Sequence, residues 1–192
     1  AASRLLPEKD ETGLEYQDSY KTWPILERLT NHVQALVQAV QVSNCQSLIA
    51  ASLFHETGDY LLERGQYALA EPLLRQAFNL HKQLLGQEHP KTAESFDCLA
   101  RWHGLQGRYE QAEPLYHQAL EMRKRLLGNE HPNVALSLNN LALLYYRQGR
   151  YSDAEPLFLR ALEMRKRLLG EGHPDVALSL NNLAVLFDNQ GR

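Results

Sequence analysis

The sequence repeats itself with a period of 42 residues, and an internal repeat of this kind constrains the fold more than any other feature. The dipeptide His-Pro begins at residues 89, 131 and 173. Glycine recurs at the same step at 65, 107, 149 and 191, and the segment Ala-Glu-Pro-Leu recurs at 70–73, 112–115 and 154–157. So many positions in one register indicate a tandem array that begins near residue 48.

Each unit is predicted to form two α-helices, as the third unit illustrates. The first helix starts at Pro132, because proline suits an early helical position where its missing N–H would be unpaired. It ends at Gly149, which favours the left-handed turn after a helix. The second helix is expected from about Ser152 to Leu169, with a small irregularity rather than a break at Pro156. Its apolar side comprises Ala154, Leu157, Phe158, Ala161, Leu162 and Leu168.

No segment shows the alternating pattern of a strand, so the sequence predicts an all-α protein. We divide it into an N-terminal segment of residues 1–47 and a repeat array of residues 48–192. Within the first segment, residues 23–42 have the pattern of one amphipathic helix that would cap the array. The array comprises three full units and the first helix of a fourth, at about 48–89, 90–131, 132–173 and 174–192. The polar start and the end in the middle of a unit suggest a piece of a longer chain.

The order of small and aromatic residues in each unit resembles the tetratricopeptide repeat. In the third unit these residues are Ala142, Gly149, Tyr151, Ala154, Phe158 and Ala161. The usual repeat has about 34 residues, and the longer unit found here is similar to that of kinesin light chain. The resemblance implies a right-handed superhelical solenoid of antiparallel helix pairs, whose first helices line a concave surface that binds protein partners.

The two sides of the first helix are expected to differ in role. Leu138, Leu141, Ala142 and Tyr145 share one side, which we assign to packing within and between units. The opposite side mixes aliphatic, aromatic and amide groups, which suits an extended peptide because an amide can pair with both N–H and C=O groups of a backbone. With three arginines added, the candidate peptide-binding residues are Asn139, Asn140, Leu143, Tyr146, Arg147, Asn181, Asn182, Val185, Arg101, Arg123 and Arg165.

The resemblance to kinesin light chain gives four of these residues a more specific role. In that family the asparagine of the Leu-Asn-x-Leu-Ala motif contacts cargo peptide, which implies the same for Asn139 and Asn181. The second-helix arginine of the family's Ala-Leu-x-x-Arg segment corresponds to Arg123 and Arg165. The asparagines have a structural alternative, a ladder that joins successive first helices, and this alternative is favoured more for Asn140 and Asn182. Both interpretations stay open at this point.

The inner face is predicted to change character along the array. It is acidic in the first two units, where it carries Ser52, His55, Glu56, Asp59, Glu94, Asp97, Cys98 and Arg101. Toward the C-terminal end, amides, aliphatic groups and arginines replace the carboxylates. A partner segment with a basic part and an acidic or aromatic part would match this face in one direction, with the acidic or aromatic part toward the C-terminal half.

Composition and motifs argue against several other functions. The net charge of -3 gives no reason to expect nucleic acid or a membrane surface as a partner, and no apolar run approaches the roughly 20 residues of a membrane helix. No phosphate-binding loop, nucleophile elbow or zinc-binding helix is present. The His-Pro histidines lie one unit apart, too far to share a metal ion. We therefore expect no catalysis, cofactor or metal.

Location and wider context are also expectations. The two cysteines, Cys45 and Cys98, have no metal or redox spacing, which favours a cytoplasmic protein. One alternative function is the sensor arm of a larger signalling ATPase of the NB-ARC or STAND type, with any ATPase activity outside this sequence. The other is a self-assembling scaffold, because the fourth first helix has no following partner helix and would leave an apolar surface at Leu180, Leu183, Ala184 and Phe187.

Overall fold

The computed structural model describes residue 38 and residues 47–192 of the chain. Seven α-helices follow one another in this part, with no strand: α2 (Leu48–Glu63), α3 (Tyr67–Leu85), α4 (Pro90–Leu105), α5 (Tyr109–Leu127), α6 (Pro132–Arg147), α7 (Tyr151–Leu169) and α8 (Pro174–Asn189). The first helices of the units are α2, α4, α6 and α8, and the second helices are α3, α5 and α7. Apart from residue 38, the capping helix predicted at 23–42 lies outside the described residues.

The His-Pro dipeptide starts the first helices α4, α6 and α8, as predicted, and the histidine supplies the cap. The ring Nδ1 of His131 accepts a hydrogen bond of 3.1 Å from the backbone N–H of Asn133, while Pro132 occupies the first helical position. His89 and His173 cap α4 and α8 in the same way. The helix α6 then ends before Gly149, whose φ of 73° is the left-handed conformation expected there.

The second helices follow the prediction at their internal proline and depart from it at their C-terminal ends. The helix α7 begins at Tyr151 and runs through Pro156 without a break, as expected. Leu168 was expected on the apolar side, but it is 38% exposed. Its counterparts Leu84 and Leu126, in the last turns of α3 and α5, are also exposed. The last turn of each second helix therefore extends beyond the core.

The predicted packing side of the first helix forms the core. Leu138, Leu141 and Ala142 of α6 are buried against α5 and α7. Small residues allow this close approach between helices: a Cβ added at Gly58, the counterpart of Ala142, would lie 2.6 Å from Cδ2 of Leu74. Each internal first helix thus packs between the second helices before and after it, which makes the core continuous from unit to unit.

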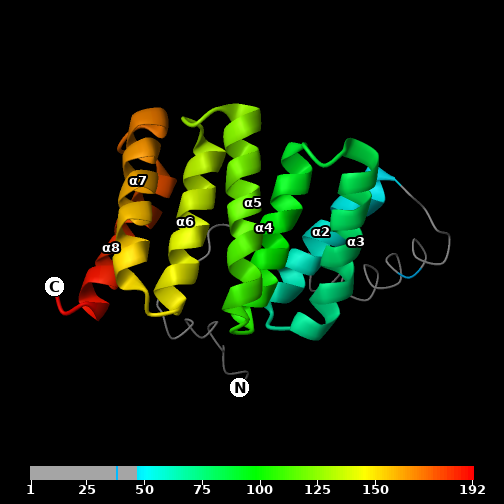
Figure 1. The fold of residues 1–192 in the computed structure, drawn as a ribbon, viewed down its shortest axis with the longest axis horizontal. Coiled ribbons are helices and arrows are strands. Elements are labelled where there is room, and N and C mark those ends of the chain that lie inside the picture. Colours follow the sequence, from blue (N-terminus) through cyan, green and yellow to red (C-terminus); the bar gives the residue numbers. More distant parts are fainter. Residues whose placement is uncertain (1–37, 39–46) are drawn as a thin grey trace, which may run out of the picture.

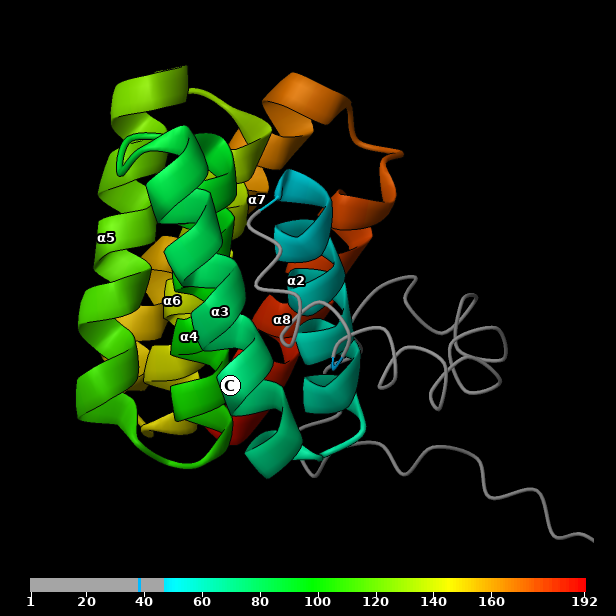
Figure 2. The ribbon, with the colours of Figure 1, turned by 90° about the vertical axis from the view of Figure 1, so that its right-hand side faces the viewer.

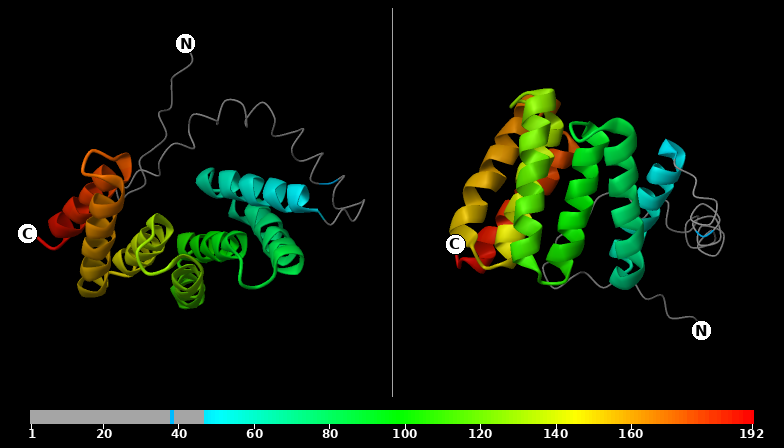
Figure 3. Two further views of the ribbon diagram at one scale, coloured as in Figure 1. Left: turned by 90° about the horizontal axis from the view of Figure 1, so that it is seen from above. Right: turned by 45° about the vertical axis from the view of Figure 1, so that its right-hand side comes forward.

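The helices stand side by side in a row (Figure 1). Seen from above, the row is an arc, with α5 on its outer side and α2 and α8 toward its inner side (Figure 3). Figure 2 likewise shows α2 and α8 on the side of the array away from α5. The first helices therefore line the concave side of an all-α solenoid, and we call their half-buried and exposed side chains on that side the concave face.

Exposed ion pairs join successive units outside the core. Each links a glutamate to an arginine 37 residues later, in the pairs Glu88–Arg125, Glu113–Arg150, Glu130–Arg167 and Glu155–Arg192. Because solvent screens such pairs, each contributes little on its own, about 0–1 kcal/mol.

Candidate functional site

Hydrogen bonds between neighbouring first helices organise the concave face. The Nδ2 group of Asn182 in α8 donates to Oδ1 of Asn139 in α6 at 2.9 Å, and Asn189 donates to the hydroxyl of Tyr146 at 2.9 Å. Cys98 Sγ lies 3.7 Å from Nε2 of His55 at the equivalent place between α2 and α4. We call these contacts, each between residues 43 apart, the inter-repeat ladder.

The ladder decides which asparagine of each pair reaches the concave face. Asn139 and Asn182 are each 3% exposed, because they bond to one another between the helices. Asn140 is half-buried and Asn181 is exposed. The groove-facing position expected for Asn139 is therefore corrected, because its side chain lies in the structural ladder. Asn140, for which the ladder was given more weight than for Asn139, lies on the concave face.

Arg123 and Arg165 lie between second and first helices rather than in the groove. Arg123 is 4% exposed and donates to a carboxylate oxygen of Asp97 in α4 and to the hydroxyl of Ser137 in α6. Arg165 is 2% exposed and donates to the hydroxyl of Ser179 at 2.7 Å and to the Asp175 carbonyl at 3.1 Å. Both guanidinium groups thus connect a second helix to the next first helix.

The same connection in the first unit uses a histidine. Nδ1 of His81 lies 2.8 Å from the hydroxyl of Ser95, the counterpart of Ser137. Burial lowers the pKa of His81 to about 4, and it also lowers the pKa of His55, whose ring centroid lies 6.1 Å away. Both histidines are therefore neutral near pH 7, which suits their packing beside one another.

Asp97 is a buried carboxyl with incomplete pairing. One oxygen accepts from Arg123, but Oδ1 has no hydrogen-bond partner among the described residues. Burial raises the pKa of Asp97 to about 6, while Arg123 acts in the opposite direction. The residue 43 positions later is Asn140, and the ladder contact found at Asn139–Asn182 is not formed there, which leaves the Asn140 amide directed elsewhere.

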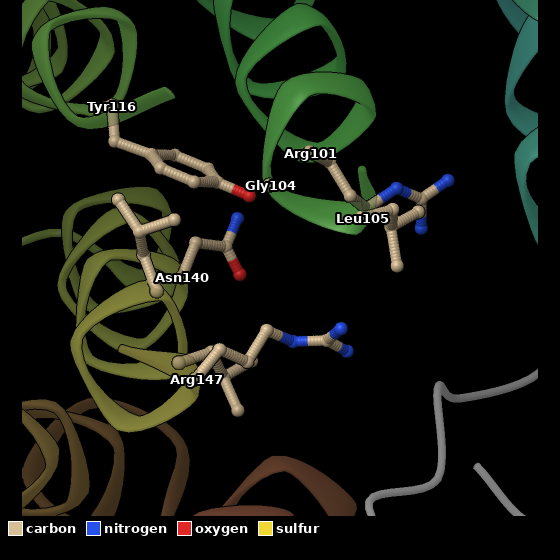
Figure 4. Close-up of a pocket in the computed structure, with 8 residues that line it drawn as sticks. Arg101, Gly104, Leu105, Tyr116, Asn140 and Arg147 are labelled. Atoms are coloured by element: carbon tan, nitrogen blue, oxygen red, sulfur yellow. The ribbon is translucent and has the colours of Figure 1, made fainter. Parts of the chain in front are cut away.

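That amide lines a small pocket between α4, α5 and α6. Figure 4 shows the Tyr116 hydroxyl directed toward the side chain of Asn140, with the guanidinium groups of Arg101 and Arg147 extending toward the open side. Arg101 also pairs with Asp59 of α2. The pocket has a volume of about 20 Å³, and its lining is Arg101, Gly104, Leu105, Tyr116, Asn140, Leu143, Leu144 and Arg147.

The sequence analysis did not select four of the residues that line the pocket: Gly104, Leu105, Tyr116 and Leu144. Gly104 could have been found by comparing the units. The first unit has Leu62 at the equivalent position and the third has Tyr146, and both side chains are buried. A missing side chain at a position that is otherwise filled indicates a hollow. Tyr116 is less easily found, because only the three-dimensional structure brings α5 to this place.

Some of the charged and amide residues predicted along the concave face are accessible there, in the predicted order. Glu56 is exposed on α2 and Glu94 is half-buried on α4, so carboxylates lie toward the N-terminal end. Arg147, Asn181 and Val185 are half-buried or exposed toward the other end. The predicted order of acidic and then amide-rich groups is thus present on the surface.

The described residues contain neither a cluster of metal-ligating side chains nor a membrane-spanning helix. Among them, no three His, Cys, Asp or Glu side chains gather where they could hold a metal ion. No helix in this part of the chain is long and apolar enough to cross a membrane. Burial raises the pKa of the Cys98 thiol well above its usual value, and nearby Asp59 adds to this effect, so the thiol stays protonated near pH 7.

Comparisons with known proteins agree with this geometry. The model of the tetratricopeptide repeat family matches residues 48–124, 93–167 and 145–192. The crystal structure of BtubC (BKLC) from P. vanneervenii is similar at 28% sequence identity with a TM-score of 0.70, over 86% of this chain and 66% of that chain. This chain therefore spans just under two thirds of BtubC.

Two solved structures from Podosopora anserina share the fold at lower identity. They are of a protein assigned as a kinesin light chain with nearly identical TPR-like repeats, one of them with the Q17M substitution. Both are 24% identical to this chain and cover 90% of it and 86% of their own chains, with TM-scores of 0.66 and 0.65. The comparison with curated proteins gave no match.

Proposed function

Because the chain belongs to the tetratricopeptide repeat family, we propose that its concave face binds an extended segment of a protein partner without catalysing a reaction. Tetratricopeptide repeats generally mediate protein–protein interactions, and proteins built from them are typically non-catalytic scaffolds. The observation that carries the proposal is the mixture of accessible side chains on the concave face, namely Arg101, Asn140, Leu143, Arg147, Asn181 and Val185.

This mixture suits a peptide better than a solvated surface would. Leu143 and Val185 offer apolar contact to partner side chains, and Asn140 and Asn181 lie beside them along the helices. An amide carries both a donor and an acceptor, so it pairs with the backbone of a partner of any sequence. The arginines add charge-assisted hydrogen bonds to acidic groups.

The candidate binding residues whose side chains are buried have a structural role in this proposal. Asn139, Asn182 and Tyr146 hold neighbouring first helices in register through the inter-repeat ladder. Arg123 and Arg165 fix each second helix to the next first helix. They act by positioning the accessible side chains, and we do not expect them to contact the partner.

The partner class follows from the charges along the face. A segment with a basic part lies near Glu56 and Glu94, and its acidic or aromatic part lies near Arg147. The binding energy then favours one direction of the partner chain. We place this function in the cytoplasm, because the sequence has two cysteines without metal or redox spacing.

A peptide-display screen against the chain tests the proposal. We expect selected peptides to lose about tenfold or more in affinity when Asn140 or Arg147 is changed to alanine, because each loses hydrogen bonds to the partner. Arg160→Ala is the matched control, since Arg160 is exposed on the second helix α7. Equal losses for Arg147→Ala and Arg160→Ala, or no loss for either, would contradict binding on the concave face.

A second candidate function is self-association through α8. Leu180 is 48% exposed, whereas its counterpart Leu138 in α6 is buried, and Ala184 is exposed beside it. Light scattering of the chain and of Leu180→Glu tests this candidate. A concentration-dependent rise in mass that Leu180→Glu removes would support it, and a monomer at all concentrations would exclude it.

A further inference from the structure

The 42-residue register extends into the segment that precedes α2. The dipeptide Ala35-Leu36 lies two periods before Ala119-Leu120 of α5 and three periods before Ala161-Leu162 of α7. Ala77-Phe78 of α3 falls on the same register between them. In every described unit this dipeptide belongs to the second helix. Residues 25–43, of which the structure describes only residue 38, therefore align with a second helix of an earlier unit.

Two positions of the second helices show which side contacts the first helix of the next unit. At one position a histidine or an arginine lies within hydrogen-bonding distance of a serine hydroxyl. The pairs are His81–Ser95, Arg123–Ser137 and Arg165–Ser179. At the other position Phe78 packs edge-on against Phe96, with ring centroids 4.7 Å apart. These contacts define the forward side of a second helix.

The corresponding positions at the start of the array are apolar on both sides of the junction. Ala39 replaces the histidine or arginine, and Leu53 of α2 replaces the serine. The ring pair becomes Leu36 and Phe54. Because both members of the hydrogen-bonded pair change together, neither is left as a buried polar group without a partner. Such a joint replacement is expected if residues 25–43 pack on α2 as α3 packs on α4.

The surface of α2 has room for a helix beside Leu53. This leucine is half-buried and lines a hollow of about 390 Å³. The other residues of the lining are Leu48, Ile49, Ser52 and Glu56. Because α2 begins one period before α4, the connection from residue 43 to Leu48 is as long as the connection from Leu85 to Pro90. The chain can therefore turn back there as it does between α3 and α4.

The opposite side of the segment is polar. Met122 of α5 clusters with Phe96 of the same unit, and its counterpart in the segment is Gln38. Gln38 is helical and exposed. Three further polar residues stand where α3 has the buried Ala70, Leu73 and Leu74, namely Arg28, Asn31 and His32. Leu74 lies against Gly58 of its own unit. A helix that is apolar toward the next unit and polar on the other side suits a terminal cap.

We propose that residues 25–43 form the second helix of an incomplete preceding unit, which docks on α2 through Leu36 and Ala39 against Phe54 and Leu53. The occupant of this face of α2 is thus a segment of the same chain, and its polar side faces solvent. The array then begins near residue 25 instead of residue 48. The helix α2, with Glu56 on the concave face, is held from both sides, as α4 is held by α3 and α5.

Methyl-labelled chain of all 192 residues tests the docking directly by NMR. We expect nuclear Overhauser effects between the Leu36 methyl groups and the Phe54 ring, and between the methyl groups of Ala39 and Leu53, because side chains in contact lie within about 4.5 Å. A filtered experiment on a mixture of labelled and unlabelled chain separates contacts within one chain from contacts between chains. The predicted contacts should be absent from the filtered spectrum.

A pair of substitutions tests the register. Ala39→Arg places a charge against Leu53 and should lower the midpoint of urea unfolding, because the guanidinium group loses water without gaining a partner. Adding Leu53→Ser recreates the arginine–serine pair of the later junctions, and it should restore at least about half of the loss. Leu53→Ser alone completes the cycle. Gln38→Arg, an equal charge change at the neighbouring exposed residue, should leave the midpoint unchanged.

Four results would overturn the proposal. Equal midpoints for Ala39→Arg and Gln38→Arg, or no recovery in the double variant, would contradict the register. Leu36 contacts with no residue of α2 would contradict the docking, and contacts with Leu143 or Val185 would assign the segment to the concave face. Contacts found only between chains would make the occupant a second copy. Each of these results leaves peptide binding untouched, so failure here is separate from failure of the proposed function.

Discussion

Replacing Asp97 with asparagine tests whether burial or ion pairing dominates the energy of this carboxyl. Asp97 is 8% exposed, and only one of its oxygens has a partner, Arg123. Burial raises its pKa from 3.8 to about 6 against the opposing effect of Arg123. The ionised carboxyl is therefore less favourable in the folded chain than in the unfolded chain, in spite of the ion pair.

The sign of the pH dependence follows from the raised pKa. Between about pH 4 and pH 6 the folded chain binds the Asp97 proton more tightly than the unfolded chain does, so the contribution of Asp97 to the free energy of unfolding falls as pH rises through this interval. The shift from 3.8 to about 6 corresponds to on the order of 3 kcal/mol. A neutral asparagine of similar shape avoids this cost at pH 7.

The third unit already contains the arrangement that the substitution would create. Asn139 occupies the position equivalent to Asp97, and Arg165 there bonds to Ser179 and to a backbone carbonyl. We expect Asp97→Asn to be more stable than the parent chain at pH 7 by up to about 3 kcal/mol, and we expect the two to be equally stable near pH 4.

Urea unfolding followed by circular dichroism at several pH values measures this difference. The comparison with the parent is essential, because His81 contributes in the opposite direction: its pKa is lowered from 6.5 to about 4, so its contribution to stability rises with pH over this range. Both chains contain His81, and its effect cancels. Glu163→Gln, an exposed control, should change stability by less than about 0.5 kcal/mol. A loss of about 3–5 kcal/mol in Asp97→Asn at pH 7, the cost of breaking a buried pair, would refute the reasoning.

Three further predictions concern the fold and are checked by thermal or urea unfolding. Asn182→Ala should destabilise the chain by about 1–3 kcal/mol, because it leaves the buried amide of Asn139 without its partner; the exposed Asn181→Ala should cost less than about 0.5 kcal/mol, and equal effects would argue against the ladder. His131→Ala should cost about 1 kcal/mol through loss of the cap on α6, and His131→Asp should retain most of the stability. Gly149→Ala should cost about 1 kcal/mol or more, because its φ of 73° is unfavourable for a side chain; Gly172→Ala, with open space and no such φ, is the matched control and should be nearly neutral.

Most of the fold could be predicted from the sequence because its determinants are local and repeated. Each His-Pro cap and each glycine after a helix recurs in register, so helix starts and ends are marked several times. The packing side, with Leu138, Leu141 and Ala142, follows from helical periodicity alone. Leu168 was misassigned because periodicity shows the side of a helix and not how far the core extends along it.

The inward side of the Asn-Asn pair could not be predicted, for a geometric reason. The sequence repeats every 42 residues, but the ladder joins residues 43 apart, so neighbouring first helices are offset by one residue. Asn139 therefore meets Asn182 and not Asn181. The identical segments 137–142 and 179–184 then differ: Asn139 is covered by α8, whereas no described helix covers Asn181.

The pocket was missed because its cause is an absent side chain. Gly104 carries no chemistry of its own, and its effect depends on the helices α5 and α6 that surround it. Burial of Arg123 and Arg165 was also missed, since an arginine near a helix end is exposed more often than not. Both depend on contacts between units that a single repeat does not contain.

A map of a selected peptide on the chain is the most direct test of the central claim that the concave face is the binding surface. Backbone amide NMR signals are compared with and without the peptide for α4, α6 and α8, and for α5 and α7 on the other side of the array. The concave face predicts the largest changes around Asn140, Leu143 and Arg147 in α6 and around Asn181 and Val185 in α8. Changes centred on the exposed side of α5 and α7, around Gln118 and Arg160, would contradict it.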